Sequence, residues 1–274
     1  MAQVRPAVTP GEVVTTTELP SEGDVKDLDP DDIRVAQKIG GSLIWLSTRT
    51  RPDIAYAQSR ISSMATKAPK RALTEGYRVL KYLKGTINYR LVYRPCTKYG
   101  PNVIAYTDAN HGVRRSQSGS VIKRGDNVIT WKSAKQATIS GSSAESEVQA
   151  LALTETVADF VKTLRESMFI QTPMVTIRCD SGAAKVLATG EGSWKTKSTA
   201  NKVARVKEQV ELLKTVEVEF CGTKDQHADS LTKFLRGGPG QKRALQHLSL
   251  VEIEPEPDTE PGEQKEPDIK TNKY

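Results

Sequence analysis

The sequence predicts an α/β fold, a mixed five-stranded sheet flanked by helices and preceded by a small helical segment. Two observations carry this prediction. Five short apolar or alternating runs between residues 103 and 220 have the length and composition of strands, and the segments between them show helical spacing. Their order along the chain, strand-strand-strand-helix-strand-helix-helix-strand-helix, fits a mixed sheet covered by helices.

The two ends of the chain are predicted to lie outside this fold. Residues 1–30 are rich in Thr, Pro, Glu and Asp without any period, which predicts a disordered leader. Residues 237–274 are predicted to be an extension that ends in a disordered acidic tail, because acids alternate with prolines from Glu254 onward. The 37% hydrophobic fraction of the 274 residues is low and agrees with such tails.

Residues 31–95 are predicted to be mostly helical. Leu43, Ile44 and Leu46 open an apolar face. Arg51-Pro52-Asp53 suits the start of a helix, since proline fits the first turn and an acid favours the positive end of the dipole. A second helix is expected from about 70 to 84 and should end at Gly85. So short a segment makes a small core and is expected to pack on the next domain.

The first three strands are expected at 103–108, 118–123 and 128–132. The connection between the last two contains Gly125-Asp126-Asn127, whose residues tolerate the positive φ angles of a tight hairpin. A long helix follows from about 143 to 168, because apolar residues recur there at helical spacing.

The second half of the sheet is expected at 175–180 and 216–220. A helix is expected to begin near Ser181 and another to cover 201–214. The strict alternation at 216–220 predicts a strand with one exposed face. The segment from Asp229 to Leu235 is expected to begin a last helix.

The charge is distributed unevenly. The net charge is +7, but residues 1–32 carry −6 and residues 252–274 carry −5, so residues 33–251 carry +18. A body this basic favours a polyanion such as nucleic acid, although a merely soluble basic surface would also account for the charge.

The sequence also bears on location. No apolar run approaches the roughly 20 residues of a membrane helix, and the start has no signal-peptide h-region. The three cysteines form no close pair and no zinc motif, which indicates reduced thiols. We therefore expect an intracellular protein, in cytoplasm or nucleus, that is neither secreted nor bound to a membrane.

Four acids stand where strands end or helices begin: Asp108, Glu147, Asp180 and Asp229. Such positions can converge on one edge of a sheet. Converging carboxylates repel one another, and hard divalent cations such as Mg²⁺ or Mn²⁺ relieve that repulsion. Two ions about 3.5–4 Å apart can hold the attacking water and the leaving oxygen of a phosphodiester.

Each acid also has an ordinary structural explanation. Asp229 could be a helix N-cap, and Asp180 could begin a turn. Glu145 and Glu147 could be favourable first-turn charges. Spacing alone leaves these alternatives open.

Six motifs follow one another in the second half of the chain: YTDA at 106–109, RSQSG at 115–119, ITWKSAKQ at 129–136, SSAESE at 142–147, CDS at 179–181 and QHADSLTK at 226–233. In this order they resemble the RNase H domain of Copia-type retrotransposon Pol polyproteins, which places an RNase H-like domain at about 100–236. IGGSL at 39–43, TRPDIAYA at 50–57 and VLKYLKGT at 79–86 resemble the reverse transcriptase connection of those polyproteins, so residues 31–95 are interpreted as a remnant of it.

The resemblance implies that Asp108, Glu147, Asp180 and Asp229 hold two Mg²⁺ ions, with Mn²⁺ as an alternative. Glu147 matches the family position because it precedes Ala150-Leu151, and Glu145 is the weaker candidate. The implied reaction is hydrolysis of the RNA strand of an RNA–DNA hybrid during reverse transcription, in which water attacks phosphorus in line and the 3′ oxygen leaves. Besides the hybrid, the upstream reverse transcriptase of the same polyprotein is a possible partner.

Two positions depart from the family. Asn110-His111 stands where the family usually has Asp-Trp, and Lys197 precedes Ser198 where the family often has a Lys-His pair. The second change puts substrate contacts in question. His227, two residues before Asp229, is predicted to move protons late in the reaction, and the alternative is a surface histidine in a loop.

Six residues are predicted to contact nucleic acid: Arg114, Arg115, Lys132, Lys135, Trp194 and Lys197. A hybrid is read mainly through its backbone and 2′-hydroxyls, which suits the cations, and Trp194 could stack on a base or sugar. The alternatives are a solvated basic face and a Trp194 that packs on the late helix.

The sequence therefore favours an RNase H, and the polymerase motif Tyr-x-Asp-Asp is absent, so no polymerase activity is expected. The alternative is a catalytically impaired nucleic-acid-binding remnant of a transposon polyprotein. An integrase-type transferase fits less well, because the hairpin before Glu147 and the Asp–Glu–Asp–Asp order suit RNase H better.

Overall fold

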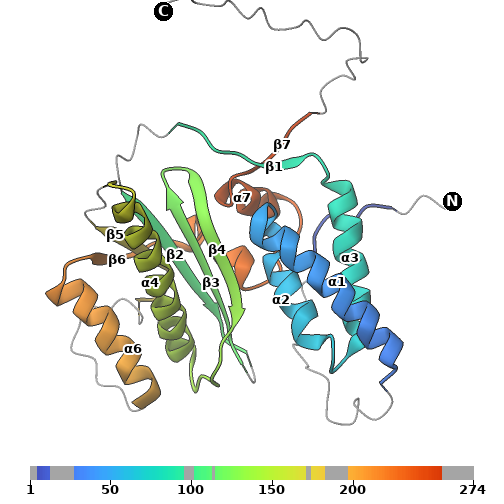
Figure 1. Ribbon diagram of the computed structural model, residues 1–274, viewed down its shortest axis with the longest axis horizontal. Helices are drawn as coiled ribbons and strands as arrows, with labels where there is room; N and C mark the ends of the chain where they lie inside the picture. Colours follow the sequence, from blue (N-terminus) through green and yellow to red (C-terminus); the bar gives the residue numbers. More distant parts are fainter. Residues whose placement is uncertain are drawn as a thin grey trace, which may run out of the picture.

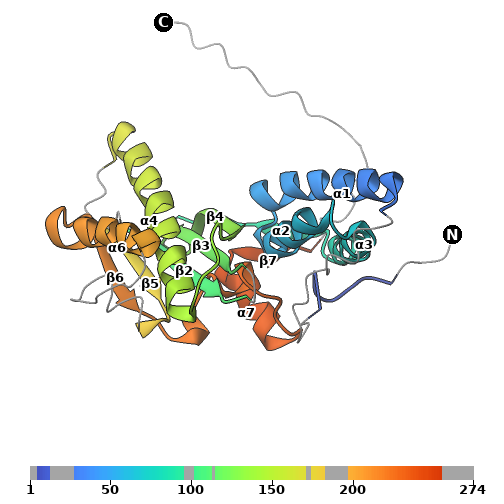
Figure 2. The same cartoon turned by 90° about the horizontal axis from the view of Figure 1, so that it is seen from below.

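The computed structural model describes residues 5–12, 28–95, 102–112, 115–170, 174–182 and 197–254. Most of the predicted leader and residues 255–274 of the predicted tail lie outside these ranges. Figures 1 and 2 show a sheet domain with a group of three helices, α1 to α3, beside it. None of the helices in the described ranges is long and apolar enough to cross a membrane.

The five strands form one mixed sheet in the order β4–β3–β2–β5–β6, which confirms the predicted fold class. The antiparallel half consists of β2 (Val103–Asn110), β3 (Gln117–Arg124) and β4 (Asn127–Lys135). On the other side of β2, β5 (Val175–Cys179) and β6 (Val216–Phe220) run parallel to it. The hairpin between β3 and β4 turns at Gly125, which adopts the predicted positive φ of 59°.

One face of the sheet is covered by α4 (Ser143–Ser167), on which α6 (Lys197–Lys207) packs. The Ser142 hydroxyl caps α4 by accepting a hydrogen bond from the backbone N–H of Glu145 at 3.2 Å. The helix expected at 201–214 is instead α6 followed by one π-helical turn, Glu208–Leu212. Of the helix expected near Ser181, the structure describes only its start.

The opposite face is covered by the C-terminal segment, because alternate strand residues such as Tyr106 and Val121 point away from α4. They pack against Leu245 and Leu248, at the end of α7 (Pro239–His247). The chain then enters β7 (Leu250–Glu252), which pairs antiparallel with β1 (Tyr89–Leu91). The described part of the predicted extension is thus folded into the body of the protein.

The prediction that a helix begins at Asp229 is wrong. The structure has a single 3-10 turn there, Asp229–Leu231. The Thr232 hydroxyl donates to the Asp229 carbonyl at 3.0 Å and also to the Asp108 carboxylate. These side-chain bonds compete with helix continuation and hold the turn against β2.

The N-terminal segment forms three helices rather than two: α1 (Pro30–Arg49), α2 (Ala55–Met64) and α3 (Pro69–Gly85). Arg51-Pro52-Asp53 leads into a short 3-10 turn, Pro52–Ile54, before α2. The group contacts the sheet domain directly, since Trp131 Nε1 donates to the Ser47 carbonyl at 2.6 Å and Gln117 Nε2 donates to Ser59 Oγ at 3.1 Å.

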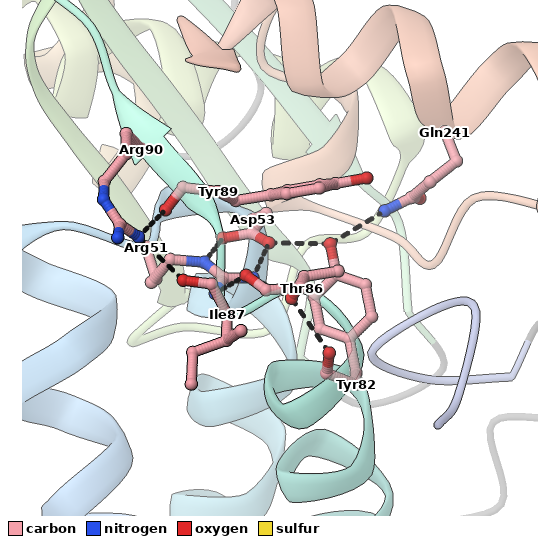
Figure 3. A network of polar contacts seen from close by, with 8 residues as sticks. All are labelled: Arg51, Asp53, Tyr82, Thr86, Ile87, Tyr89, Arg90 and Gln241. Carbon is pink, nitrogen blue, oxygen red and sulfur yellow. Dashed lines mark hydrogen bonds and ion pairs between the residues drawn. The ribbon is translucent and has the colours of Figure 1, made fainter. Parts of the chain in front are cut away.

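A buried polar network holds this segment together (Figure 3). Arg51 donates to both oxygens of Asp53, at 3.0 and 2.8 Å, and to the hydroxyl of Thr86 at 2.6 Å. Tyr82 donates to Asp53 at 2.7 Å, and Gln241 of α7 donates to the Tyr82 hydroxyl at 3.5 Å. Burial first, and then the Asp53 charge, raises the pKa of Tyr82, so the phenol stays protonated. The network therefore joins α3 to the C-terminal segment.

We expect Arg51→Met to lower the free energy of unfolding by about 3–5 kcal/mol, because Asp53 would remain as a buried charge without its cation. Urea unfolding followed by circular dichroism measures this. Arg34→Met is the matched control, since Arg34 and its partner Asp31 are 79% and 76% exposed, and it should cost less than about 1 kcal/mol. Equal, small effects of the two variants would contradict the assigned role of the network.

Candidate metal centre

Strand register brings two of the predicted acids together. Thr107 of β2 lies opposite Cys179 of β5 in the parallel pair, so the next residues, Asp108 and Asp180, emerge side by side at the same edge. Asp229 begins the 3-10 turn that Thr232 ties to Asp108. One carboxylate oxygen from each of Asp108, Asp180 and Asp229 lies within 4.8 Å of the others.

Glu147 lies in the second turn of α4 and interacts with this trio. Burial, followed by the charges of Asp108 and Asp180, raises the pKa of Glu147 to about 8. The backbone N–H of Ala109, next to Asp108, donates a hydrogen bond to the Glu147 carboxylate. No hydrogen-bond partner from the described residues reaches its buried Oε2 atom.

The trio carries more negative charge than its surroundings neutralise. Burial is the main reason that the pKa of Asp108 is raised to about 6; Asp229 and Asp180 add to the effect, whereas Thr232 and Lys233 oppose it. The Lys233 ammonium lies 3.0 Å from Asp229 Oδ1. Burial disfavours the charge of Lys233, but Asp108 and Asp229 outweigh that effect and raise its pKa.

The donor set fits a hard divalent cation. It consists of carboxylate oxygens, the ligands that Mg²⁺ and Mn²⁺ prefer, and it includes no sulfur or imidazole. The orphaned Oε2 of Glu147 is a buried acceptor that a cation would satisfy. Asp108, Asp180 and Asp229 are therefore placed to hold a metal ion, with Glu147 beside them.

Glu145, the weaker candidate, has a different role. Its Oε2 accepts from the backbone N–H of Gly141 at 2.8 Å, and its Oε1 accepts from the Thr199 hydroxyl at 2.8 Å. Both oxygens thus fasten the start of α4 to the preceding loop and to α6. These contacts favour Glu147 over Glu145 as the metal ligand.

His227 is half-buried, and its role in proton transfer stays a prediction. Its ring stacks between the rings of Tyr106 and His247, each 3.9 Å away between centroids. Burial first, and then the Lys123 charge, lowers the pKa of His227 to about 2. This shift favours the neutral ring near pH 7. A neutral imidazole is not able to act as an imidazolium acid at the carboxylates.

A basic groove lies between β4, α4 and α6. Lys132 and Lys135 of β4 line it together with Lys202 and Arg205 of α6, over a floor that includes Ala134 and Ala152. The described residues that line it include no acid, but Arg205 is paired with the buried Glu155, at 3.0 Å from Nε to Oε2. Lys202 and Arg205 are not among the predicted contacts, although their spacing of three residues on a helix places them on one face.

The remaining predicted contacts divide into two groups. Arg115 is exposed, and its charge is one of those that, after burial, lower the pKa of Lys135. Arg114 and Trp194 lie outside the described residues, and Lys197 begins α6 with its side chain outside them as well. Asn110, which departs from the family pattern, donates to the Thr232 carbonyl at 3.3 Å and so holds the turn.

Comparisons with known proteins agree with this description. The chain is 30% identical over 241 residues to the retrovirus-related Pol polyprotein from transposon RE1 of Arabidopsis thaliana, and 32% identical over 245 residues to that from transposon RE2 of the same plant. Each match covers 86% of this chain and 16% of the relative. No protein-family model matches. Among solved structures, RNase H1 from Halobacterium salinarum NRC-1 is 19% identical with a TM-score of 0.38, over 47% of this chain and 93% of that one.

The sheet order, the helices on its faces and the acids at its edge define an RNase H-like domain preceded by a helical segment. Homologues of this chain include retrovirus-related Pol polyproteins from Copia-like transposons of Arabidopsis thaliana. The chain spans 16% of the length of the two relatives from Arabidopsis.

We expect Asp180→Asn to stabilise the metal-free protein, because the Asp180 charge raises the pKa of both Asp108 and Glu147. The expected gain is a higher Tm, because one of the repelling charges is removed from the metal-free folded state. Thermal unfolding in EDTA at pH 8 measures it. Glu217→Gln, an exposed acid on β6, is the control and should change little. A loss of stability in Asp180→Asn would contradict repulsion within the centre.

Proposed function

We propose that this chain hydrolyses the RNA strand of an RNA–DNA hybrid, as the RNase H of a Copia-type retrotransposon. The observation that carries the proposal is the carboxylate trio within 4.8 Å, with the orphaned Glu147 oxygen beside it. We assign two Mg²⁺ ions to Asp108, Glu147, Asp180 and Asp229. The upstream reverse transcriptase of the polyprotein is proposed as a second partner.

Divalent cations held there would activate water and neutralise charge on the phosphodiester. The residues of the chain supply the geometry. Thr232 fixes one oxygen of Asp108, and Lys233 limits the repulsion that Asp229 feels. The buried position of Glu147 keeps its carboxylate strongly basic until a cation stabilises the charged form.

The basic groove supports a nucleic-acid substrate. Gln136 Nε2 donates to the carbonyl of Ser146, the neighbour of Glu147, at 2.8 Å, and Gln136 also lines the groove. The groove and the acids are therefore joined through one buried side chain. Cations along a groove bind a sugar–phosphate backbone, whereas the acids with their ions act on a single phosphate.

Glu147→Gln should lower Mg²⁺-dependent cleavage of a labelled RNA–DNA hybrid by at least about 10³-fold, because loss of a metal ligand removes several kcal/mol of charge stabilisation. Glu145→Gln is the matched control on the same helix and should retain cleavage within about tenfold of native. A denaturing gel with Mg²⁺, and with EDTA, gives both rates. Equal losses in the two variants, or no cleavage by the native chain in Mg²⁺, would contradict the proposal.

Lys132→Ala and Lys135→Ala should each weaken hybrid binding and reduce the slope of log K against log salt by about one unit. Fluorescence anisotropy in EDTA at several salt concentrations measures this without cleavage. Lys38→Ala, an exposed lysine of α1, is the control. An unchanged slope in both groove variants would show that the groove does not contact the backbone.

A further inference from the structure

The turn that carries Asp229 is attached to β2 residue by residue. Gln226, 2% exposed, donates from Nε2 to the Thr107 carbonyl at 2.9 Å. The ring of His227 lies on the ring of Tyr106, and Thr232 donates to Asp108. Three consecutive residues of the strand, 106 to 108, thus each receive one contact from the turn.

The ring contact is a stack of three. Tyr106 and His227 are nearly parallel, with an interplanar angle of 8° and centroids 3.9 Å apart. His247, the last residue of α7, continues the stack at 3.9 Å and 16°. The rings come from β2, from the turn and from the C-terminal helix, so their spacing fixes three elements relative to one another.

Two rings of the stack are each two residues away in sequence from an acid of the trio, Asp108 or Asp229. Tyr106 precedes Asp108 by two residues on the same face of β2, and His227 precedes Asp229 by two residues. A change in the distance between the two rings would therefore also change the distance between the Asp108 and Asp229 carboxylates, because each acid is only two residues from its ring. The tie of Thr232 to Asp108 works in parallel with it.

Neighbouring groups hold the stack in place. Lys123, 3% exposed on β3, lies 3.0 Å from the His247 carbonyl and 3.4 Å from His227 Nδ1. On the same strand, a Cβ added to Gly119 would meet Thr232 Cγ2 at 2.8 Å and the Ala228 carbonyl at 2.9 Å. The glycine lets the turn seat directly on β3.

We propose that His227 and His247 are positioning residues of the metal centre: the Tyr106–His227–His247 stack sets where Asp229 lies relative to Asp108. The C-terminal helix α7 is then part of the centre rather than an appended segment. Only the measurement of hybrid cleavage rests on the proposed function. The measurement of Mn²⁺ affinity tests the positioning role without it.

The primary experiment is Mn²⁺ binding to the full chain, followed by electron paramagnetic resonance of the free ion. His227→Ala and His247→Ala should each raise the Kd for Mn²⁺ about tenfold, the usual effect of removing a residue that orients a metal ligand. His227→Phe and His247→Phe keep a flat ring and should bind within about twofold of native. Phe160→Ala removes a 67% exposed ring far along α4 and is the control.

The kinetic readout separates positioning from folding. Hybrid cleavage by His227→Ala should show a lower kcat with an unchanged KM, and saturating Mn²⁺ should restore part of the rate. If the alanine variants unfold, His227→Leu replaces them, since it keeps apolar volume without a ring.

Native Mn²⁺ affinity in a folded His227→Ala or His227→Leu variant would overturn the proposal. Failure of both folded phenylalanine variants to restore binding would overturn it as well. A native chain that binds Mn²⁺ but does not cleave would defeat the proposed function and leave this inference standing, whereas a native chain that binds no Mn²⁺ would end both.

Discussion

The structure depends on one constraint: carboxylates that repel one another are kept together at one edge of the sheet. Burial and mutual repulsion raise the pKa of Asp108 to about 6 and that of Glu147 to about 8. The parallel register of β2 and β5, the hydrogen bond from Thr232 to Asp108 and the ion pair of Lys233 with Asp229 hold the carboxylates together against this repulsion. Divalent cations would replace this repulsion with attraction, so the geometry would be more stable with metal bound than without it.

Parts of the chain far from the centre contribute to this geometry. Phe234 follows Lys233 and packs edge-on against Tyr56 of α2, with centroids 4.8 Å apart, and the Arg60 guanidinium lies 5.5 Å from its ring. The N-terminal helical group thus supports the end of the turn that begins at Asp229. This contact of Phe234 adds to those that Trp131 and Gln117 make with the same helical group.

The strands could be predicted from the sequence because their signals are local. Alternation and apolar runs located all five, and parallel neighbours then required Asp108 and Asp180 to emerge together. Long-range features could not be predicted in the same way. The pairing of β1 with β7 joins residues about 160 positions apart. The Thr232 hydroxyl, next to the turn at Asp229, donates to the Asp108 carboxylate on β2. His227 was placed near the chemistry by its spacing from Asp229, but spacing could not reveal that Tyr106 and His247 enclose its ring.

Four separated acids are proposed here to share one cation site. A crystal of the full chain soaked in Mn²⁺ and measured at the manganese absorption edge tests it most directly. We expect anomalous density in contact with Asp108, Asp180 and Asp229, with a second peak about 3.5–4 Å away on the side of Glu147. Density elsewhere on the protein with none among these carboxylates, at an Mn²⁺ concentration that saturates binding in solution, would contradict it.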